Sequence, residues 1–120
     1  MPSTITFKRG QVIVVDVPFS DHSGTKPRPA MIISADAFHR DLPDIIVCPI
    51  SSQPRYYTHP GPGDCPLQAW RAIGLRHPST LRVSKLLAID KRIARRTLGT
   101  APPEDLARVN VALRQALALA

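Results

Sequence analysis

The sequence has few cysteines and few aromatic residues, and it has no long hydrophobic segment. Its two cysteines, Cys48 and Cys65, are separated by 16 residues without a CxxC motif, so we expect free or buried thiols rather than a disulfide or a redox pair. No segment approaches the roughly 20 apolar residues of a membrane span, and residues 1–10 lack the basic and then apolar order of a signal peptide. These absences predict a cytoplasmic chain without a membrane partner.

Several motifs of enzymes and metal sites are also missing. The sequence contains no GxxxxGK[ST], GxGxxG, HExxH or GxSxG, which removes the sequence basis for a nucleotide-binding enzyme, a zinc protease or a serine hydrolase. The nearest arrangement of metal ligands, His59 and Cys65, lacks two further ligands. No cluster of carboxylates suggests Mg²⁺ chemistry. We therefore expect no metal and no cofactor.

The length favours one domain spanning residues 1–120. A chain of 120 residues with 43% hydrophobic residues buries roughly two-thirds of its unfolded surface, which is enough for one core without disulfides or a structural metal. On the same ground we do not expect a two-domain enzyme, a doubly wound nucleotide fold or a long repeat array.

Acidic residues are scarce in the second half of the chain. Residues 1–70 hold six basic and six acidic residues, whereas residues 71–120 hold ten basic and three acidic ones, so the whole net charge of +7 lies after residue 70. A concentrated, arginine-rich charge indicates an anionic partner such as nucleic acid or an acidic protein, or else a solvated basic face.

The hydrophobic pattern predicts short strands followed by one helix. The run at residues 11–17 is rich in β-branched residues and reads as a buried strand. Pro49 cannot donate to a strand ladder, so its strand is expected at an edge or to end there. The proline-rich stretch from residue 53 to residue 68 is expected to be a mobile loop. Strands are expected at residues 11–17, 29–34, 44–51, 81–89 and 92–98.

The last segment changes to a helical period. Its apolar residues, Leu106, Val109, Leu113 and Leu117, fall on one helical face, and two prolines precede them. Short strands, long loops and one closing helix favour a small, partly open β-barrel, mainly β with α, over a sandwich.

Two short segments carry residues suited to phosphate chemistry. Arg28 lies between two prolines that restrict its backbone, which makes it either a well-placed fork for a phosphate or a surface arginine in a stiff turn. Ser51, Ser52 and Gln53 follow a predicted strand, where they can donate to a phosphoryl oxygen or cap a turn. These residues alone leave both alternatives open.

Four segments in this order resemble the MazF/PemK family of toxin endoribonucleases. They are RGQVIVV at residues 9–15, SGTKPRPA at 23–30, CPISSQ at 48–53, and the stretch 74–99 that precedes the terminal helix. The resemblance implies an SH3-like, partly open barrel of the CcdB/MazF type. It also implies a homodimer that cleaves single-stranded RNA without metal and is neutralised by an antitoxin protein.

The resemblance also assigns site residues. Arg28 matches the family's catalytic arginine, and Ser51 matches its catalytic threonine. Arg82 matches a second arginine that is found in the PemK branch. Ser84 falls where that branch commonly has an aspartate that accepts the 2′-hydroxyl proton. A serine is a poor base at neutral pH, so the general base is uncertain, with His22 as one alternative. The residues expected to bind RNA are Lys26, Ser52, Gln53, Lys85, Lys91 and Arg92.

The aromatic residues next to the long loop have two possible roles. Trp70, Tyr56 and Tyr57 could stack unpaired bases or belong to the core or a dimer interface. Two alternatives to a nuclease remain: a gyrase poison on the same barrel, and a degenerate member that binds RNA and antitoxin but cleaves poorly because of Ser84. The C-terminus lacks the Trp-bearing tip of the gyrase poisons.

Overall fold

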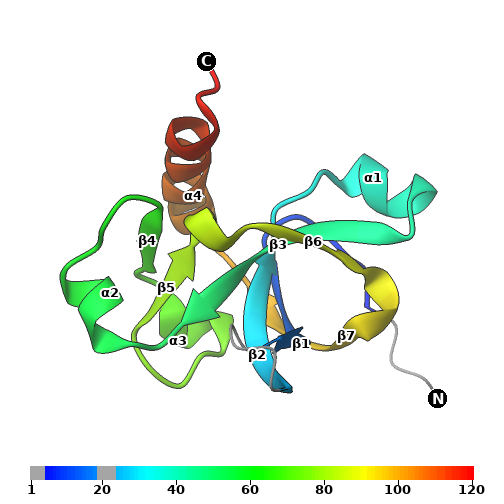
Figure 1. Cartoon of the computed structure of the whole chain (residues 1–120), viewed down its shortest axis with the longest axis horizontal. Coiled ribbons are helices and arrows are strands. Elements are labelled where there is room, and N and C mark those ends of the chain that lie inside the picture. Colours follow the sequence, from blue (N-terminus) through cyan, green and yellow to red (C-terminus); the bar gives the residue numbers. More distant parts are fainter. Residues whose placement is uncertain (1–4, 19–23) are drawn as a thin grey trace.

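The computed structural model describes residues 5–18 and 24–120, which form one bent sheet with helices at its margins (Figure 1). The sheet has seven strands in the order β4-β5-β3-β2-β1-β7, and β6 also pairs with β3. All pairings between neighbouring strands are antiparallel. The strands are β1 (Gln11–Pro18), β2 (Thr25–Ile32), β3 (Asp44–Ser51), β4 (Asp64–Leu67), β5 (Ser79–Arg82), β6 (Leu87–Asp90) and β7 (Ala94–Thr100).

The helices are short except for the last one. The α-helices are α1 (Asp36–Asp41), α2 (Pro54–Thr58), α3 (Trp70–Ile73) and α4 (Pro103–Leu117), and the 3-10 turns are η1 (Val83–Lys85) and η2 (Lys91–Ile93). Helix α4 stands beside β4 and β5, whereas α1 lies on the other side of the molecule, near β6 (Figure 1). None of the helices in residues 5–18 and 24–120 has the length and apolar character needed to cross a bilayer.

The structure confirms a partly open barrel with a C-terminal helix. Strands β4 and β7 end the strand order and, among the described residues, do not pair with each other, so the sheet stays open. Consecutive β-branched residues are buried on both faces of the central strands. Val12 packs with Met31 and α4's Val109 in one cluster, whereas Ile13 packs with Ile32 and Val47 in a second cluster. Burial on both faces explains why the run at residues 11–17 does not alternate with polar residues.

Strand β3 is central, so the expectation of an edge at Pro49 was wrong. On one side β3 pairs with β2 through Pro49 and Ala30. On the other side it pairs with β6 up to Val47 and with β5 from Ile50. Pro49 therefore lies where one partner strand replaces another, a position at which a missing N–H disrupts no ladder.

The sequence predicted a loop over the whole proline-rich stretch from residue 53 to residue 68, and this was wrong. The stretch contains helix α2 and the edge strand β4. Pro54 occupies the first turn of α2, where a missing N–H is tolerated. The expected strand at residues 81–89 is also interrupted, because η1 separates β5 from β6. This turn lets the chain leave β5 at one end of β3 and return as β6 at the other.

Both cysteines are free and buried, as expected. Burial, together with the neighbouring Cys65, raises the pKa of the Cys48 thiol to about 12. Burial also raises the pKa of Cys65. Both side chains therefore remain protonated near neutral pH and pack as small apolar groups in the cluster around Val12 and Met31.

Asp105, in the first turn of α4, connects the terminal helix to the sheet. Its carboxylate is 1% exposed and accepts the backbone N–H groups of Gln68 at 3.2 Å and Ala69 at 3.0 Å. Arg108 also contacts it. This carboxylate therefore satisfies two backbone donors in the segment between β4 and α3.

Replacing Asp105 with asparagine is expected to lower the free energy of unfolding by about 2 kcal/mol, because one buried N–H then faces an amide NH₂ instead of an acceptor. Urea denaturation measures the change. Glu104→Gln is the matched control, since Glu104 is exposed in the same turn. If Asp105→Asn were as stable as the unmodified protein, this anchoring role would be refuted.

Candidate active site

A basic cleft of about 400 Å³ lies where β1, β2 and β7 meet the end of β3 and the segment that precedes β5. Its lining combines groups suited to holding a phosphate with an apolar floor. The polar lining residues are Arg28, Ser52, Arg76, His77, Ser79 and Arg96, and the apolar part includes Val14, Pro29, Leu75 and Leu98. Three guanidinium groups around one hollow form a strongly anion-attracting surface.

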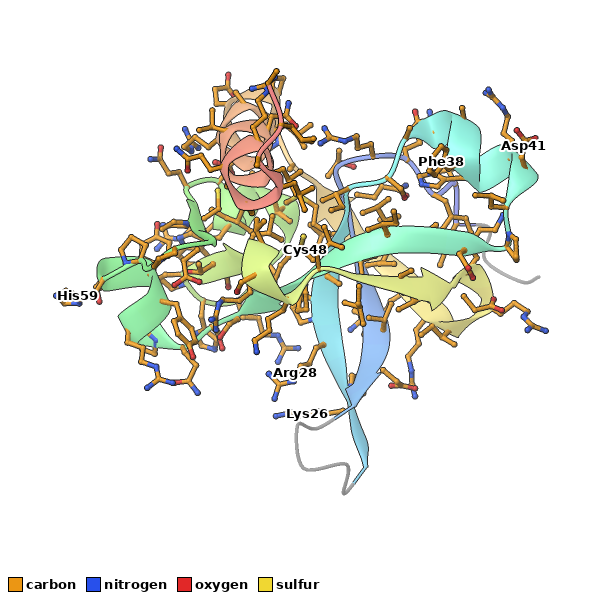
Figure 2. The ribbon with its side chains drawn as sticks, turned by 45° about the horizontal axis from the view of Figure 1, so that its top comes forward. Lys26, Arg28, Phe38, Asp41, Cys48 and His59 are labelled. Carbon is orange, nitrogen blue, oxygen red and sulfur yellow. The ribbon has the colours of Figure 1, made fainter. Side chains whose placement is uncertain are left out.

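Arg28 reaches this cleft from within a strand rather than from a loop. Strand β2 begins at Thr25, and Arg28 pairs with Val15 of β1, so its backbone belongs to the regular ladder. The strand expected at residues 29–34 therefore begins four residues earlier than the sequence pattern predicted. Lys26 and Arg28 extend from β2 to the same side, toward the part of the molecule that carries α2 (Figure 2). The ladder and the flanking prolines restrict the backbone of Arg28 more than a turn would.

The opposite wall is the segment between α3 and β5. Gly74, with a φ of 101°, ends α3 in the left-handed conformation, and its N–H donates to the carbonyl of Arg71. The hydroxyl of the buried Ser79 donates to the carbonyl of His77 at 2.7 Å. Both ends of the segment that carries Arg76 and His77 are therefore held in place.

A second hollow of about 450 Å³ adjoins the basic cleft. The two share Ser52 and His77. The remaining lining of the second hollow is mainly apolar. It comes from α2 and from the last residue before β5: Pro54, Tyr57, Thr58 and Pro78. An aromatic ring beside prolines suits the face of an unpaired base.

Only one serine of the pair at residues 51 and 52 lines the basic cleft. Ser52 lines both hollows. The hydroxyl of Ser51 instead accepts the backbone N–H of Gln53 at 3.2 Å, which is the turn-capping alternative of the sequence analysis. Gln53 is exposed and precedes α2.

Arg82 and Ser84 lie in a different cluster, next to the edge strand β4. The Nε of Arg82 is 2.6 Å from the Oδ1 of Asp64, its partner in the ladder between β4 and β5. The guanidinium of Arg82 also lies 3.7 Å from the centre of the Tyr56 ring. A hydrogen bond from Arg55, and then the contact with Arg82, lowers the pKa of the Tyr56 hydroxyl. Arg82 is therefore already paired, and it would have to leave Asp64 to bind a phosphate.

The structure places the remaining expected RNA-binding residues at separate points of the surface. Lys26 and Lys85 are exposed. The ammonium group of Lys91 donates to the carbonyl of His39 at 2.6 Å, and Arg92 forms an exposed ion pair with Asp90 at 2.9 Å. The hydrogen bond from Arg92 lowers the pKa of Asp90. The excess positive charge is thus partly neutralised by local partners. Exposed ion pairs of this kind contribute little to stability, so a phosphate can replace the carboxylate partner easily.

Four polar residues that line the cleft were not among the site residues expected from the sequence: Arg76, His77, Ser79 and Arg96. The signal that could have indicated Arg76 and His77 is the run of Arg76, His77 and Pro78, in which a proline restricts a basic segment as the prolines beside Arg28 do. His22, the alternative base, lies outside the described residues. In residues 5–18 and 24–120 no three His, Cys, Asp or Glu side chains gather as metal ligands.

The fold is shared with solved toxin structures. A mycobacterial endoribonuclease in complex with its cognate antitoxin has a TM-score of 0.76 and 21% identity, over 94% of this chain and 96% of that chain. MazF in a MazE–MazF crystal structure from Deinococcus radiodurans has a TM-score of 0.75 and 23% identity, over 98% and 100%. The Mycobacterium tuberculosis toxin MazF-mt6 has a TM-score of 0.73 and 19% identity, over 92% and 98%.

A comparison with curated protein sequences finds no significant match. The family model for the PemK-like, MazF-like toxin of type II toxin–antitoxin systems, however, matches residues 8–117, nearly the whole chain. This match covers the strands that build the basic cleft and the terminal helix that covers the sheet. The chain therefore belongs to the PemK/MazF toxin family.

Proposed function

We propose that this chain is the toxin of a type II toxin–antitoxin pair and an endoribonuclease that cleaves single-stranded RNA without a metal ion. The observation that carries the proposal is the single cleft that Arg28, Arg76, Arg96 and Ser52 line together. Phosphodiester cleavage places additional negative charge on phosphoryl oxygens, and guanidinium groups positioned beforehand stabilise that charge. The basic cleft supplies this stabilisation with side chains alone.

In the proposed reaction the ribose 2′-hydroxyl attacks the adjacent phosphorus. The products are a 2′,3′-cyclic phosphate and a 5′-hydroxyl. Arg28 binds the non-bridging oxygens as a fork, and Ser52 donates a further hydrogen bond. Arg76 and Arg96 hold the backbone of the RNA in the cleft. Ser51, Arg82 and Ser84 remain candidate catalytic residues from the family resemblance. A phosphate would have to compete with Asp64 for the guanidinium group of Arg82.

The same surface suits the proposed protein partners. An acidic antitoxin segment would be attracted to the basic cleft by the field that attracts RNA. We also propose a cytoplasmic homodimer in which each protomer is a single domain over residues 1–120.

The test is incubation of the purified protein with single-stranded RNA in the presence of EDTA. We expect fragments that end in 2′,3′-cyclic phosphate and begin with 5′-hydroxyl, identified by mass spectrometry and by end labelling. Binding of uncleaved RNA should weaken as salt rises, because each neutralised phosphate releases a counterion. Salt-sensitive binding without any cleavage would refute the proposed nuclease activity and favour a family member that only binds RNA. The pairing of Arg82 with Asp64 is compatible with such a member. Inhibition of gyrase in a DNA-relaxation assay, without RNA cleavage, would indicate a poison of that enzyme.

A further inference from the structure

His77 lies at the junction of the two hollows of the candidate active site. The basic cleft contributes Arg28, Arg76 and Arg96, and the adjoining hollow contributes Tyr57 and prolines. Of the residues that the structure describes, only His77 and Ser52 line both hollows. In a nucleotide the ribose connects the phosphate to the base. A nucleotide with its phosphate among the arginines and its base beside Tyr57 therefore has its ribose next to His77 and Ser52.

The backbone of His77 is fixed although its side chain is exposed. Pro78 restricts the conformation of the preceding residue, and the buried Ser79 hydroxyl holds the His77 carbonyl at 2.7 Å. The exposed side chain can meet a ligand. A fixed backbone with an accessible ring is the arrangement that proton transfer to a bound substrate requires.

The chemistry of the lining leaves one group able to accept the 2′-hydroxyl proton. Arginine side chains stay protonated and have no acceptor. The hydroxyls of the lining serines, of Thr58 and of Tyr57 belong to residue types that are weak bases at neutral pH. Among the described residues that line the two hollows, none is Asp or Glu. An imidazole ordinarily exchanges its proton between pH 5 and 8.

We propose that His77 is the general base of the cleavage reaction, an inference that rests on the proposed endoribonuclease function. A neutral ring nitrogen of His77 takes the proton of the ribose 2′-hydroxyl as the 2′-oxygen forms its bond to phosphorus. The bond between phosphorus and the 5′-oxygen breaks, and the leaving oxygen takes a proton from water while the arginine N–H groups donate hydrogen bonds to the phosphoryl oxygens. His77 then returns its proton to solvent. This assignment places the base in the Arg28 cleft and not at Ser84, which lies beside Gly63 near β4.

The test compares His77→Ala and His77→Gln with the unmodified protein under single-turnover conditions from pH 5 to pH 8.5. We expect the maximal rate to fall by about 10²–10⁴-fold, the range typical of a lost general base, with RNA affinity within about threefold. The decline of the rate on the acid side should disappear in both variants. Added imidazole should restore part of the activity of His77→Ala. The charged groups that line the cleft with His77, namely Arg28, Arg76 and Arg96, stay unchanged in these variants.

His59→Ala is the matched control. His59 follows α2 at the outer edge of the molecule and points away from Arg28 (Figure 2), and it lines neither hollow. We expect its rate and pH profile to match those of the unmodified protein. Thermal unfolding of every variant shows whether the fold is kept, which is expected because both histidines are exposed.

Three outcomes would overturn the assignment. In the first, Arg28→Ala is inactive while His77→Ala cleaves at close to the normal rate; the proposed function then stands and only the role of His77 falls. In the second, the acid-side decline survives in His77→Ala but disappears in His22→Ala or Asp21→Asn, which moves the base to the segment outside the described residues. In the third, the unmodified protein does not cleave RNA, and the proposed function falls together with His77.

Discussion

Replacement of Arg28 by alanine is expected to lower the single-turnover rate of RNA cleavage by about 10²–10³-fold, equivalent to about 2.7–4 kcal/mol of barrier. The physical reason is that Arg28 is a charged donor whose backbone is held by the β1–β2 ladder and two flanking prolines. Such a donor needs little reorganisation when charge develops on the phosphoryl oxygens. Quenched-flow or gel-based cleavage of a defined RNA measures the rate.

Two further variants separate charge from geometry. Arg28→Lys keeps the positive charge and loses the planar fork, so its rate should lie between those of Arg28→Ala and the unmodified protein. Arg40→Ala is the control for net charge, because Arg40 is exposed in the last turn of α1. Helix α1, which carries the labelled Phe38 and Asp41, lies on a different side of the molecule from Arg28 (Figure 2). Loss of activity in Arg40→Ala equal to that in Arg28→Ala would mean that only total charge matters and would contradict a specific role for Arg28.

Gly99→Ala is expected to lower the free energy of unfolding by about 3 kcal/mol, because it overpacks a contact between two backbones. A Cβ at position 99 would lie 2.1 Å from the carbonyl oxygen of Ile73 and 2.8 Å from its carbonyl carbon. These are backbone atoms at the end of α3, so no side chain can rotate away. The thermal midpoint should fall by on the order of 10 °C.

The same substitution should also impair the basic cleft. Gly74, Leu75 and Arg76 follow directly on Ile73 and line the cleft, so separating α3 from β7 displaces the segment that presents Arg76 and His77. We expect weaker RNA binding and slower cleavage at a temperature where the variant is still folded. Gly61→Ala is the matched control, because a Cβ there meets only an oxygen of Asp64 at an ordinary 3.6 Å. Equal stability of Gly99→Ala and Gly61→Ala would show that α3 is not packed against β7 in this way.

Local patterns in the sequence were sufficient to predict those strands and helices in which the hydrophobic period and the placement of prolines indicate the same structure. The β-branched run at residues 11–17 and the apolar run at residues 44–51 match β1 and β3. The apolar positions of residues 103–117 match α4, with Val109 and Leu113 buried. Hydrophobic period and proline placement act within a few residues, so they can be read from the chain alone.

Elements that depend on distant partners were predicted less well. Pro54 and Pro66 argued for a loop, yet α2 tolerates Pro54 in its first turn, and β4 accepts Pro66 as an edge strand beside β5. The break between β5 and β6 likewise has no strong local signal, because it arises where β3 changes its partner. Such features depend on pairing between segments that are far apart in sequence.

From the sequence we could recognise the family and the partly open barrel, and we predicted one basic domain with Arg28 as the central candidate for the site. The residues that accompany Arg28 became visible only in the folded chain, which brings Ser52, Arg76, His77 and Arg96 to one cleft and pairs Arg82 with Asp64. The physical reason is the range of the interactions. Strand and helix propensity is local, whereas the neighbours of a charged side chain are set by sheet order and by the close approach of α3 to β7, which no short segment of the sequence encodes.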